Sequence, residues 1–328
     1  MQNIYQAVVV GGGLTGIMAM RTLKEKGIDS ILLLEKNVSI GGRLATVRFG
    51  EALVDYGAQF FSVRSATFRK SVDQWLQNGL IEHWFGESHP RYRSVGGMEQ
   101  LVTYLAQGIE LQLDVKVEQI LEREEGFLLY LEDGESIYTE SLVITAPAPQ
   151  AVTLLKQVQL RKDAARVLSD IHFHPCLVAL LGLNAPFAVG NAGYRDKELP
   201  EGIERIVDHQ QKGMSSLPSI SIYMTGTWSS DWFEKQDEEI LEAILKKVNV
   251  DINPQSIQMK QLKRWSYAEA SRPARMPFLE GSNTKPLFIA GDAFLYPEDS
   301  SGRTRMETAF LSGIAVGEAL AQRLTFHK

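Results

Sequence analysis

The sequence predicts an α/β fold with two intertwined domains, and three observations lead to that prediction. The first is the length, because 328 residues exceed the about 250 to 300 that a single hydrophobic core usually holds. The second is a strand, a glycine-rich turn, a helix and a second strand within residues 5–34. The third is a buried strand at residues 286–290 that is followed by a long apolar helix.

Composition and charge exclude several classes of protein. With 44% hydrophobic and 23% charged residues, the chain has the composition of a compact globular protein, and disordered or fibrous classes fit poorly. The net charge is −6 and the basic residues are scattered, so the sequence lacks the basic patch that nucleic acid requires. No apolar run approaches the ~20 residues of a membrane-spanning helix. We therefore expect a cytoplasmic protein without nucleic-acid or membrane partners.

Cysteine and histidine usage limits the chemistry further. Cys176 is the only cysteine, which excludes internal disulfides and a CxxC dithiol relay, so redox chemistry requires a bound cofactor. His172, His174 and Cys176 alternate along a predicted strand and would share one face. There is no fourth ligand at a suitable spacing, and Pro175 indicates an edge strand. We predict no metal site.

The N-terminal segment has the pattern of a Rossmann-like βαβ unit. Residues 5–10 are apolar and β-branched, and Gly11-Gly12-Gly13-Leu14-Thr15-Gly16 then opens a helical pattern that ends at Gly27. A second apolar strand covers residues 31–34 and ends in Glu35. A glycine turn in this context, with an acidic residue about twenty positions later, predicts a dinucleotide-binding site.

Each residue of this turn has a distinct predicted role. Gly11 permits the tight turn, Gly13 lets backbone N–H groups approach a diphosphate, and Gly16 allows close packing of the helix on the strand. The helix N-terminus attracts the phosphates, and Glu35 accepts hydrogen bonds from the adenosine ribose. The predicted ADP-binding residues of this unit are Gly11, Gly13, Leu14, Thr15, Gly16, Glu35 and Lys36.

The sequence beyond Glu35 departs from an ordinary NAD domain, which would enter another helix. It continues through Gly41-Gly42-Arg43 and Asp55-Tyr56-Gly57-Ala58-Gln59-Phe60-Phe61. These segments resemble the signature of the monoamine oxidase and protoporphyrinogen oxidase superfamily. The resemblance implies that FAD is the cofactor and that Arg43 contacts its diphosphate. The cofactor contacts implied in this region are Gly42, Arg43, Gly57, Ala58, Gln59 and Phe60.

The far end of the chain supports the same resemblance. The strand at residues 286–290 leads into Gly291-Asp292, and a helix is predicted from Met306 to Leu324. The resemblance implies that Asp292 accepts a hydrogen bond from the ribityl chain. It also implies that the helix N-terminus faces the flavin pyrimidine edge, where the helix dipole favours negative charge. The implied contacts are Gly291, Asp292, Met306, Glu307 and Ala309.

The middle of the chain completes both domains. A helix from residue 98 to 107, a strand at 111–119, a hairpin around Asp133-Gly134 and a buried strand at 142–145 form a β-meander on the first domain. The resemblance to the superfamily implies that the backbone at Val117 meets the adenine. The predicted FAD-binding domain comprises residues 1–62, 94–150 and 262–328, and a smaller α+β substrate domain, built on a mixed sheet, comprises 63–93 and 151–261.

The predicted substrate domain has a different pattern. Its strands are longer, as at residues 176–183 and 219–225, and an acidic helix covers 237–248. Trp228, Trp232 and Phe233 are expected in its hydrophobic core. The loops at 191–200 and 209–218 are rich in glycine, proline and polar residues and are expected to be the most mobile.

Within the superfamily, the chain most resembles the renalase family. The segments that carry this resemblance are 57–61, 92–98, 264–268 and 306–313. It implies oxidation of isomeric dihydronicotinamide forms of NAD(P) by hydride transfer to FAD, with molecular oxygen then giving hydrogen peroxide. Two departures are Thr308, where bacterial renalases usually have glycine, and a longer loop at 293–305.

Hydride transfer needs orientation and a dry pocket more than an acid or a base. We therefore expect aromatic pocket walls, and no acid or base residue is assigned. The substrate-pocket candidates are Gln59, Phe60, Tyr92, Trp265 and Tyr267. FAD is expected to be noncovalent, because no cysteine lies near the C-terminal flavin segment.

Two other functions stay open at the level of sequence. A flavin amine oxidase or desaturase is the first, although no lysine is evidently placed for the flavin-bound water of amine oxidases. A non-enzymatic regulator, similar to the GDP dissociation inhibitors that reuse this fold without flavin, is the second. The joint presence of the glycine turn, Glu35, Arg43 and Asp292 argues against the regulator, which has no chemical need for them.

Overall fold

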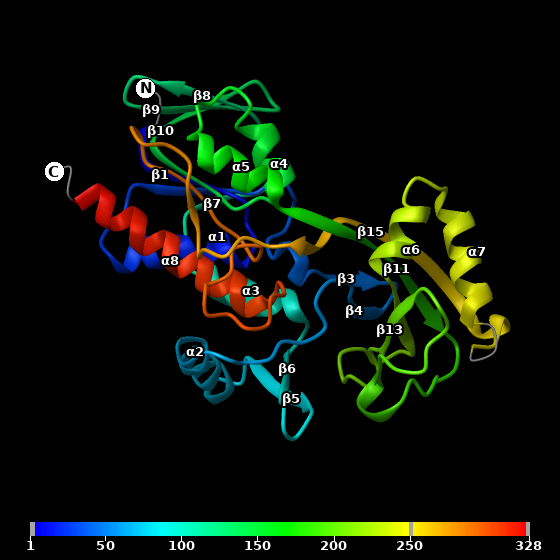
Figure 1. Cartoon of the computed structure of the whole chain (residues 1–328). Helices are drawn as coiled ribbons and strands as arrows, with labels where there is room; N and C mark the ends of the chain where they lie inside the picture. The colour runs from blue at the N-terminus through cyan, green and yellow to red at the C-terminus, as the bar shows by residue number, and fades with distance from the viewer. Residues whose placement is uncertain (1–3, 249–251, 326–328) are drawn as a thin grey trace.

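The molecule has two lobes that are joined by long strands. The computed structural model describes residues 4–248 and 252–325. Residues 1–3 and 326–328 of the predicted FAD-binding domain and 249–251 of the substrate domain lie outside the described residues. Figure 1 shows a first lobe around α1 and α8 and a second lobe around α6 and α7, with β11 and β15 running between them.

The first lobe is built on a largely parallel sheet. In spatial order its strands are β16 (Leu279–Glu280), β17 (Leu287–Ile289), β10 (Ser136–Ile144), β1 (Ile4–Val10), β2 (Ile31–Leu34) and β7 (Leu111–Gln112). All of these pairs are parallel except β16 with β17. The carboxyl ends of parallel strands meet at one edge, where open α/β sheets bind ligands. The predicted Rossmann-like fold is confirmed.

The β-meander is present, with two corrections to its predicted strands. β8 (Val117–Arg123), β9 (Gly126–Leu131) and β10 pair antiparallel in sequence. The hairpin strand and the buried strand predicted at 142–145 are one continuous strand, β10. The strand predicted at 111–119 is two strands, because Asp114 has a φ of 57° and turns the chain between β7 and β8.

Two helices from opposite ends of the chain pack closely on this sheet. They are α1 (Leu14–Glu25) and α8 (Met306–Thr325). A Cβ atom at Gly313 would lie 2.5 Å from the Thr15 carbonyl oxygen, and one at Gly317 would lie 2.9 Å from that of Ala19. The two glycines therefore let the helix backbones approach each other. Although α8 has 20 residues, no helix within residues 4–248 and 252–325 is long and apolar enough to cross a membrane.

The second lobe is a five-stranded sheet with helices on one face. Its order is β12 (Tyr194–Arg195), β13 (Ile203–Asp208), β14 (Ser219–Met224), β11 (His172–Leu183) and β15 (Ile257–Arg272). α6 (Gly226–Trp232) and α7 (Asp237–Val248) share a hydrophobic core with it. Trp228, Trp232 and Phe233 pack against that core, as predicted.

The prediction that Pro175 marks an edge strand is wrong. β11 lies between β14 and β15, and the register with β15 shifts between His174 and Cys176. Proline is tolerated in the middle of a sheet at such a bulge, because no ladder hydrogen bond is required there. The bulge also means that His172, His174 and Cys176 do not share one face of the strand. His172 and His174 are exposed, whereas Cys176 is buried. Among the described residues, no three His, Cys, Asp or Glu side chains gather in a metal-binding group.

The remaining elements pack against one lobe or the other. They are β3 (Thr46–Phe49), β4 (Ala52–Asp55), α2 (Ala66–Gln77), β5 (Ile81–Phe85), β6 (Arg91–Ser94), α3 (Met98–Leu105), α4 (Ala148–Leu154) and α5 (Lys162–Asp170). Phe68 and Trp75 of α2 contact Phe310 of α8, with ring centroids 5.0 and 5.7 Å apart. α2 therefore shares its core with the first lobe, while the exact domain boundaries stay a prediction.

The close contact of α1 and α8 makes a testable prediction. A Gly313→Ala substitution forces the helices apart, and overpacking of this kind costs about 1 to 3 kcal/mol. We expect a lower urea midpoint than that of the wild type. Glu318→Ala, on the exposed face of the same helix, is the matched control and should leave the midpoint unchanged. An unchanged midpoint for the Gly313 variant would show that the helices do not touch there.

Candidate functional site

The glycine turn between β1 and α1 combines crowded and open positions. Gly11 has a φ of 118°, and a Cβ atom at Gly16 would lie 2.0 Å from the Gly11 carbonyl oxygen. A Cβ atom at Gly13, in contrast, would meet nothing within 4 Å. Gly11 and Gly16 thus serve the turn itself, whereas Gly13 borders open space at the N-terminus of α1. The backbone N–H groups of a helix N-terminus attract anions.

The Glu35 carboxylate is fixed beside this turn. It accepts hydrogen bonds from the Gly12 N–H at 2.7 Å and from the Asn37 N–H at 2.8 Å. The Glu35 backbone carbonyl accepts from the Val115 N–H at 3.0 Å, and Val117 follows at the start of β8. Lys36 is exposed. The structure thus gathers these residues at the end of β2, where the sequence predicts the adenosine, while their contacts with a ligand stay a prediction.

Arg43 lies in a loop that runs alongside the glycine turn. The Gly41 N–H donates to the Gly12 carbonyl at 2.9 Å, and a Cβ atom at Gly42 would lie 3.6 Å from the Gly13 Cα atom. The Arg43 guanidinium donates two hydrogen bonds to Asp292, at 2.6 and 2.9 Å. A bidentate pair of this kind is strong and directional. It connects segments that are 249 residues apart in sequence.

The segment around Asp292 therefore borders the same space as the glycine turn. A Cβ atom at Gly291 would meet nothing within 4 Å. The Gly291 N–H donates to Ser312 Oγ at 3.0 Å, and Thr15 Oγ1 donates to the Ala309 carbonyl at 3.0 Å. These contacts attach both the end of β17 and the first turn of α1 to α8. We use the term cofactor groove for the space bordered by Gly13, Arg43, Gly291 and Asp292.

The polar side chains at the N-terminus of α8 are engaged by protein groups. The Glu307 carboxylate accepts from the Arg64 N–H at 3.1 Å and from the N–H and hydroxyl of Ser65, each at 2.7 Å. Thr308 Oγ1 accepts from the Arg305 N–H at 2.8 Å and donates to its carbonyl. The Thr308 hydroxyl is thus satisfied by the Arg305 backbone. Met306, which begins α8, is buried.

The predicted pocket residues converge on one segment, residues 56–61. Trp265 stacks on Tyr56 with ring centroids 5.3 Å apart and donates from its indole N–H to the Tyr56 carbonyl. Tyr92 exchanges backbone hydrogen bonds with Phe61 and stacks on its ring. Gln59 and Phe60 lie within the segment. The Ala58 N–H donates to the Arg43 carbonyl at 2.8 Å, so the whole segment lies beside the cofactor groove.

Tyr267 joins this site through its backbone rather than its ring. Its carbonyl accepts a hydrogen bond from the Arg43 guanidinium at 3.3 Å, and its ring packs against Phe173. Tyr92 is buried, and its hydroxyl accepts from Arg69 at 3.1 Å. The structure brings the five pocket candidates to one region, where Tyr92 joins the aromatic core around Phe61 and Phe60 joins a different aromatic group.

That group, which we call the aromatic wall, consists of Phe60, Trp84, Phe85 and Tyr194. The ring centroid of Phe60 lies 6.1, 5.6 and 5.4 Å from those of Trp84, Phe85 and Tyr194. All four side chains are half-buried. Sequence reasoning missed three of them. The adjacent Trp84 and Phe85 were a visible aromatic signal, whereas Tyr194, which begins β12, lies in a segment that the sequence predicts only as a mobile loop.

A buried polar cluster lies next to the wall. Lys212 Nζ donates to Asp55 Oδ2 at 2.6 Å and to Gln59 Oε1 at 2.9 Å, and both ion-pair side chains are 0 to 1% exposed. Asp55 Oδ1 accepts from the Met98 N–H at 2.9 Å. Gln59 Nε2 also hydrogen bonds with the Tyr223 hydroxyl. Gln59 is therefore fully engaged by protein groups, and a direct contact with substrate would break these bonds.

The loop at 209–218, expected to be mobile, is held by buried side chains instead. His209, Lys212 and Ser215 are all buried. Desolvation lowers the pKa of Lys212, and the neighbouring Asp55 opposes that effect. Desolvation lowers the pKa of His209 well below its ordinary value, with the Lys212 charge acting in the same direction. Sequence reasoning missed Lys212, because a lysine in a polar loop gives no signal of burial.

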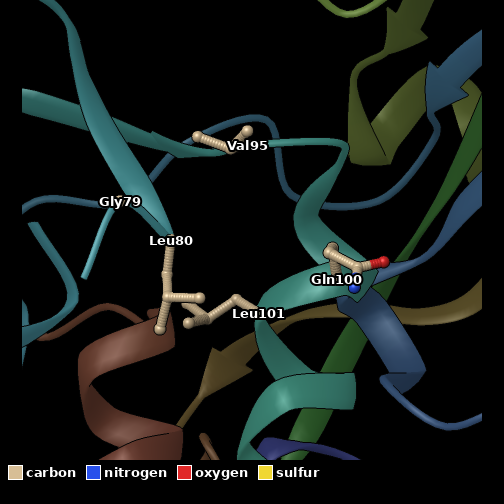
Figure 2. Close-up of a pocket in the computed structure, with 5 residues that line it drawn as sticks. All are labelled: Gly79, Leu80, Val95, Gln100 and Leu101. Atoms are coloured by element: carbon tan, nitrogen blue, oxygen red, sulfur yellow. The ribbon is translucent and has the colours of Figure 1, made fainter.

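A separate hollow of about 180 Å³ lies away from these residues. Figure 2 shows its lining of Gly79, Leu80, Val95, Gln100 and Leu101, with Leu80 and Leu101 pointing toward each other. Ligand pockets for small molecules usually measure about 300 to 1,000 Å³ and contain placed polar groups. This hollow is smaller and mostly apolar, so the candidate site is the cofactor groove with the aromatic wall.

Comparisons with known proteins agree with this geometry. The family model described as flavin-containing amine oxidoreductase matches residues 65–321, which is more than half of the chain. The chain belongs to this family. A model of NAD(P)-binding Rossmann-like domains matches residues 9–75. The family member is accordingly an FAD-dependent oxidoreductase, and the sequence prediction of its superfamily and its cofactor is confirmed.

Curated relatives match only in short segments. Polyamine oxidase 7 of Oryza sativa subsp. japonica is 40% identical over 55 residues, which cover 17% of this chain and 12% of the relative. Amine oxidase B of Bos taurus, a flavin-containing enzyme, is 30% identical over 114 residues, which cover 32% of this chain and 22% of the relative. The aligned segments thus span less than a quarter of either relative.

A solved structure matches the whole fold. The crystal structure of a protein from Exiguobacterium sp. 255-15, described as "Putative protoporphyrinogen oxidase", has a TM-score of 0.72 and covers 99% of both chains. Its sequence identity is 12%, so this likeness shows the shared fold alone.

The residues present fit FAD. Gly13 and Gly291 border open space from opposite ends of the chain, and the Arg43 guanidinium lies between them with 30% of its side chain exposed. Arg43 and the α1 N-terminus would hold the diphosphate, Glu35 the ribose, and Asp292 a hydroxyl of the ribityl chain. FAD binding would then compete with the hydrogen bonds between Arg43 and Asp292.

A substitution at the open position Gly13 should weaken cofactor binding without affecting folding. Gly13 has a φ of −75°, which alanine adopts freely, so Gly13→Ala should leave the urea midpoint of the cofactor-free protein unchanged. The added methyl group occupies space needed by the diphosphate, and overpacking of about 1 to 3 kcal/mol corresponds to a FAD dissociation constant about 5- to 150-fold higher. Fluorescence titration of the cofactor-free protein with FAD measures this dissociation constant. An unchanged affinity would mean that FAD does not contact this turn.

His209 predicts a pH dependence of stability. The unfolded chain takes up a proton at its ordinary pKa of about 6.5. The buried side chain does not, since its pKa is well below that value. The folded state should therefore lose up to about 1.4 kcal/mol per pH unit as the pH falls below about 6.5. His209→Gln, which keeps a donor for Ser221, should reduce this slope in urea unfolding between about pH 7 and about pH 5.5.

The control for this pH experiment is His83→Gln, at an exposed position. It should retain the slope of the wild type. Equal slopes for the wild type and the His209 variant would contradict the burial of His209.

Proposed function

We propose that this FAD-dependent oxidoreductase is a renalase-like oxidase of a small reduced substrate, namely isomeric dihydro forms of NAD(P). The substrate loses a hydride from its dihydronicotinamide ring and leaves as NAD(P)⁺. Bound FAD supplies the two-electron acceptor and passes the electrons to molecular oxygen, which gives hydrogen peroxide with two protons. The proposal includes noncovalent FAD and a cytoplasmic location.

The aromatic wall supports a planar ring as substrate. Phe60 is two residues from Ala58, whose N–H donates to the carbonyl of Arg43 in the cofactor groove. The wall therefore begins next to the groove. Aromatic side chains orient planar rings by stacking and exclude water from them. Hydride transfer depends on such orientation, because holding the reacting atoms in the correct geometry lowers the barrier.

The positive charge beside the aromatic wall favours one class of substrate over another. The Arg91 guanidinium lies 5.4 Å from the ring centroid of Phe60, and that of Arg69 lies 5.9 Å from Tyr92. Phosphates of a dinucleotide are stabilised by arginine, which binds them in bidentate geometry. A protonated amine would be repelled by Arg91, which lies against the wall, whereas the charge of Arg69 is paired with Asp73 at 3.9 Å. This arginine flank is the observation that most favours a dinucleotide.

In this proposal the residues of the site position the cofactor and the substrate. Arg43 and Asp292 lie in the cofactor groove, Trp265 and Tyr92 support the segment 56–61, and Phe60 offers its ring. We assign no acid or base, because a hydride leaves the substrate without a separate proton transfer.

Amine oxidation is the second candidate, and two observations favour it. The family model and the curated relatives are named for amine oxidation. In addition, Lys212 lies beside Gln59, although sequence reasoning found no lysine near the flavin segment. Its ammonium is, however, fully buried and hydrogen bonded to Asp55 and Gln59, which leaves little scope for a flavin-bound water. A regulator without flavin agrees poorly with the family assignment.

Anaerobic titration distinguishes the two enzyme functions. Purified protein should be yellow and should release FAD on denaturation, because the cofactor is noncovalent. Mixing with the 2- or 6-dihydro isomers of NAD(P) should bleach the flavin absorbance, and oxygen should restore it with hydrogen peroxide as product. Benzylamine and polyamines are the comparison substrates. Bleaching by amines alone would eliminate the renalase-like function.

A further inference from the structure

The fully buried lysine at the back of the aromatic wall has three kinds of neighbour. Lys212 Nζ lies 2.6 Å from Asp55 Oδ2, 2.9 Å from Gln59 Oε1 and 5.0 Å from the centroid of the Trp84 ring. An ammonium group has three N–H donors. A carboxylate, a carboxamide and an aromatic face thus surround it. One cation therefore contacts both the polar cluster and the aromatic wall.

The position of the ammonium defines the two faces of Trp84. The Lys212 side chain is 0% exposed, whereas Trp84 is half-buried and donates its indole N–H to the Ala192 carbonyl at 2.9 Å. The ammonium therefore lies on the protein side of the indole. An external cation would therefore meet the opposite face of the ring, whose electrons also interact with Lys212.

We propose that Lys212 is a positioning and specificity residue of the substrate site: it orients Gln59 and makes the Trp84 part of the aromatic wall unfavourable for cationic ligands such as amines. This inference rests on the proposed function, because it takes the wall to be the surface that meets the substrate.

The specificity follows from the electrostatics of aromatic rings. A cation is attracted to a ring by the negative potential of its face. A buried ammonium on one face makes the potential of the ring less negative, so a second cation on the opposite face is attracted less strongly. The Asp55 carboxylate, 2.6 Å away, balances the lysine charge at longer range. The effect is therefore confined to ligand groups that lie against the ring itself.

The positioning follows from the hydrogen bonds of Gln59. Lys212 donates to Gln59 Oε1, so this atom must be the oxygen of the amide and Nε2 must point the other way. Nε2 then donates to the Asp55 carbonyl at 2.8 Å and to the Tyr223 hydroxyl. The amide is held at both ends, and the backbone that leads into Phe60 is fixed with it.

The experiment removes the buried charges without leaving one unpaired. Loss of one partner of a buried ion pair is strongly destabilising, whereas a neutral replacement of both is tolerated. The test variant is accordingly the double substitution Asp55→Asn with Lys212→Met, in the FAD-loaded protein. A second variant, Asp55→Asn with Lys212→Gln, keeps more of the hydrogen bonds in case the first does not fold.

The matched control is Lys263→Met. Lys263 Nζ also lies 5.0 Å from an aromatic centroid, that of Tyr56, which is not part of the aromatic wall. The probes are benzyltrimethylammonium, an inert cation with one aromatic ring, and benzyl alcohol, its neutral counterpart. Binding is measured from the perturbation of the flavin absorbance.

The neutral variants should bind benzyltrimethylammonium about 2- to 30-fold more tightly than the wild type, as expected for a released cation–π face. Binding of benzyl alcohol should not change. Lys263→Met should leave the ratio of the two affinities at its wild-type value. Lys212→Arg, which retains the charge, should do so too.

Two results would overturn the role of Lys212. One is an equal change for both probes, which a purely structural role would produce, and the other is an unchanged or absent response to the cation in both neutral variants. Anaerobic bleaching of the wild type, measured alongside, tests the substrate separately. Bleaching by dihydronicotinamides with an unchanged probe ratio refutes Lys212 alone, whereas bleaching only by amines refutes the proposed function.

Discussion

The contact between α1 and α8 is the constraint on which the rest of the structure depends. At Gly313 the α8 backbone has no side chain to keep it from the Thr15 carbonyl, so the last helix can lie directly on the first. Parallel pairing of β1, β10 and β17 then aligns their carboxyl ends. The glycine turn and Asp292 emerge at the same edge as a result. The cofactor groove is a consequence of this packing.

A second set of interactions joins this groove to the other lobe. Asp55 ends β4 and accepts one hydrogen bond from the start of α3, while Lys212 reaches it from the loop between β13 and β14. Burying such a pair is costly unless both charges remain together. The pair therefore fixes where the second sheet meets the segment 56–61. The aromatic wall and the cofactor groove are held in one geometry by this contact.

Much of the cofactor groove could be predicted from sequence, because the local backbone geometry requires particular residues there. Gly11, Gly13 and Gly16 each serve a different need of one turn, and the spacing alone reveals them. The polar cluster could not be predicted in this way. Lys212 is recognisable only through Asp55, a partner 157 residues away, and nothing local distinguishes it from an exposed lysine. Pro175 was misread for a similar reason, because a bulge inside a sheet depends on the neighbouring strand.

The most direct test of the central claim, that one FAD lies between the two ends of the chain, is a crystal structure of the protein purified with its flavin. We expect electron density for the diphosphate beside Gly13 within hydrogen-bonding distance of Arg43. We also expect the ribityl chain at Asp292 and the isoalloxazine ring next to Phe60. Density for the flavin elsewhere, with the Arg43 and Asp292 pair closed over the glycine turn, would contradict it.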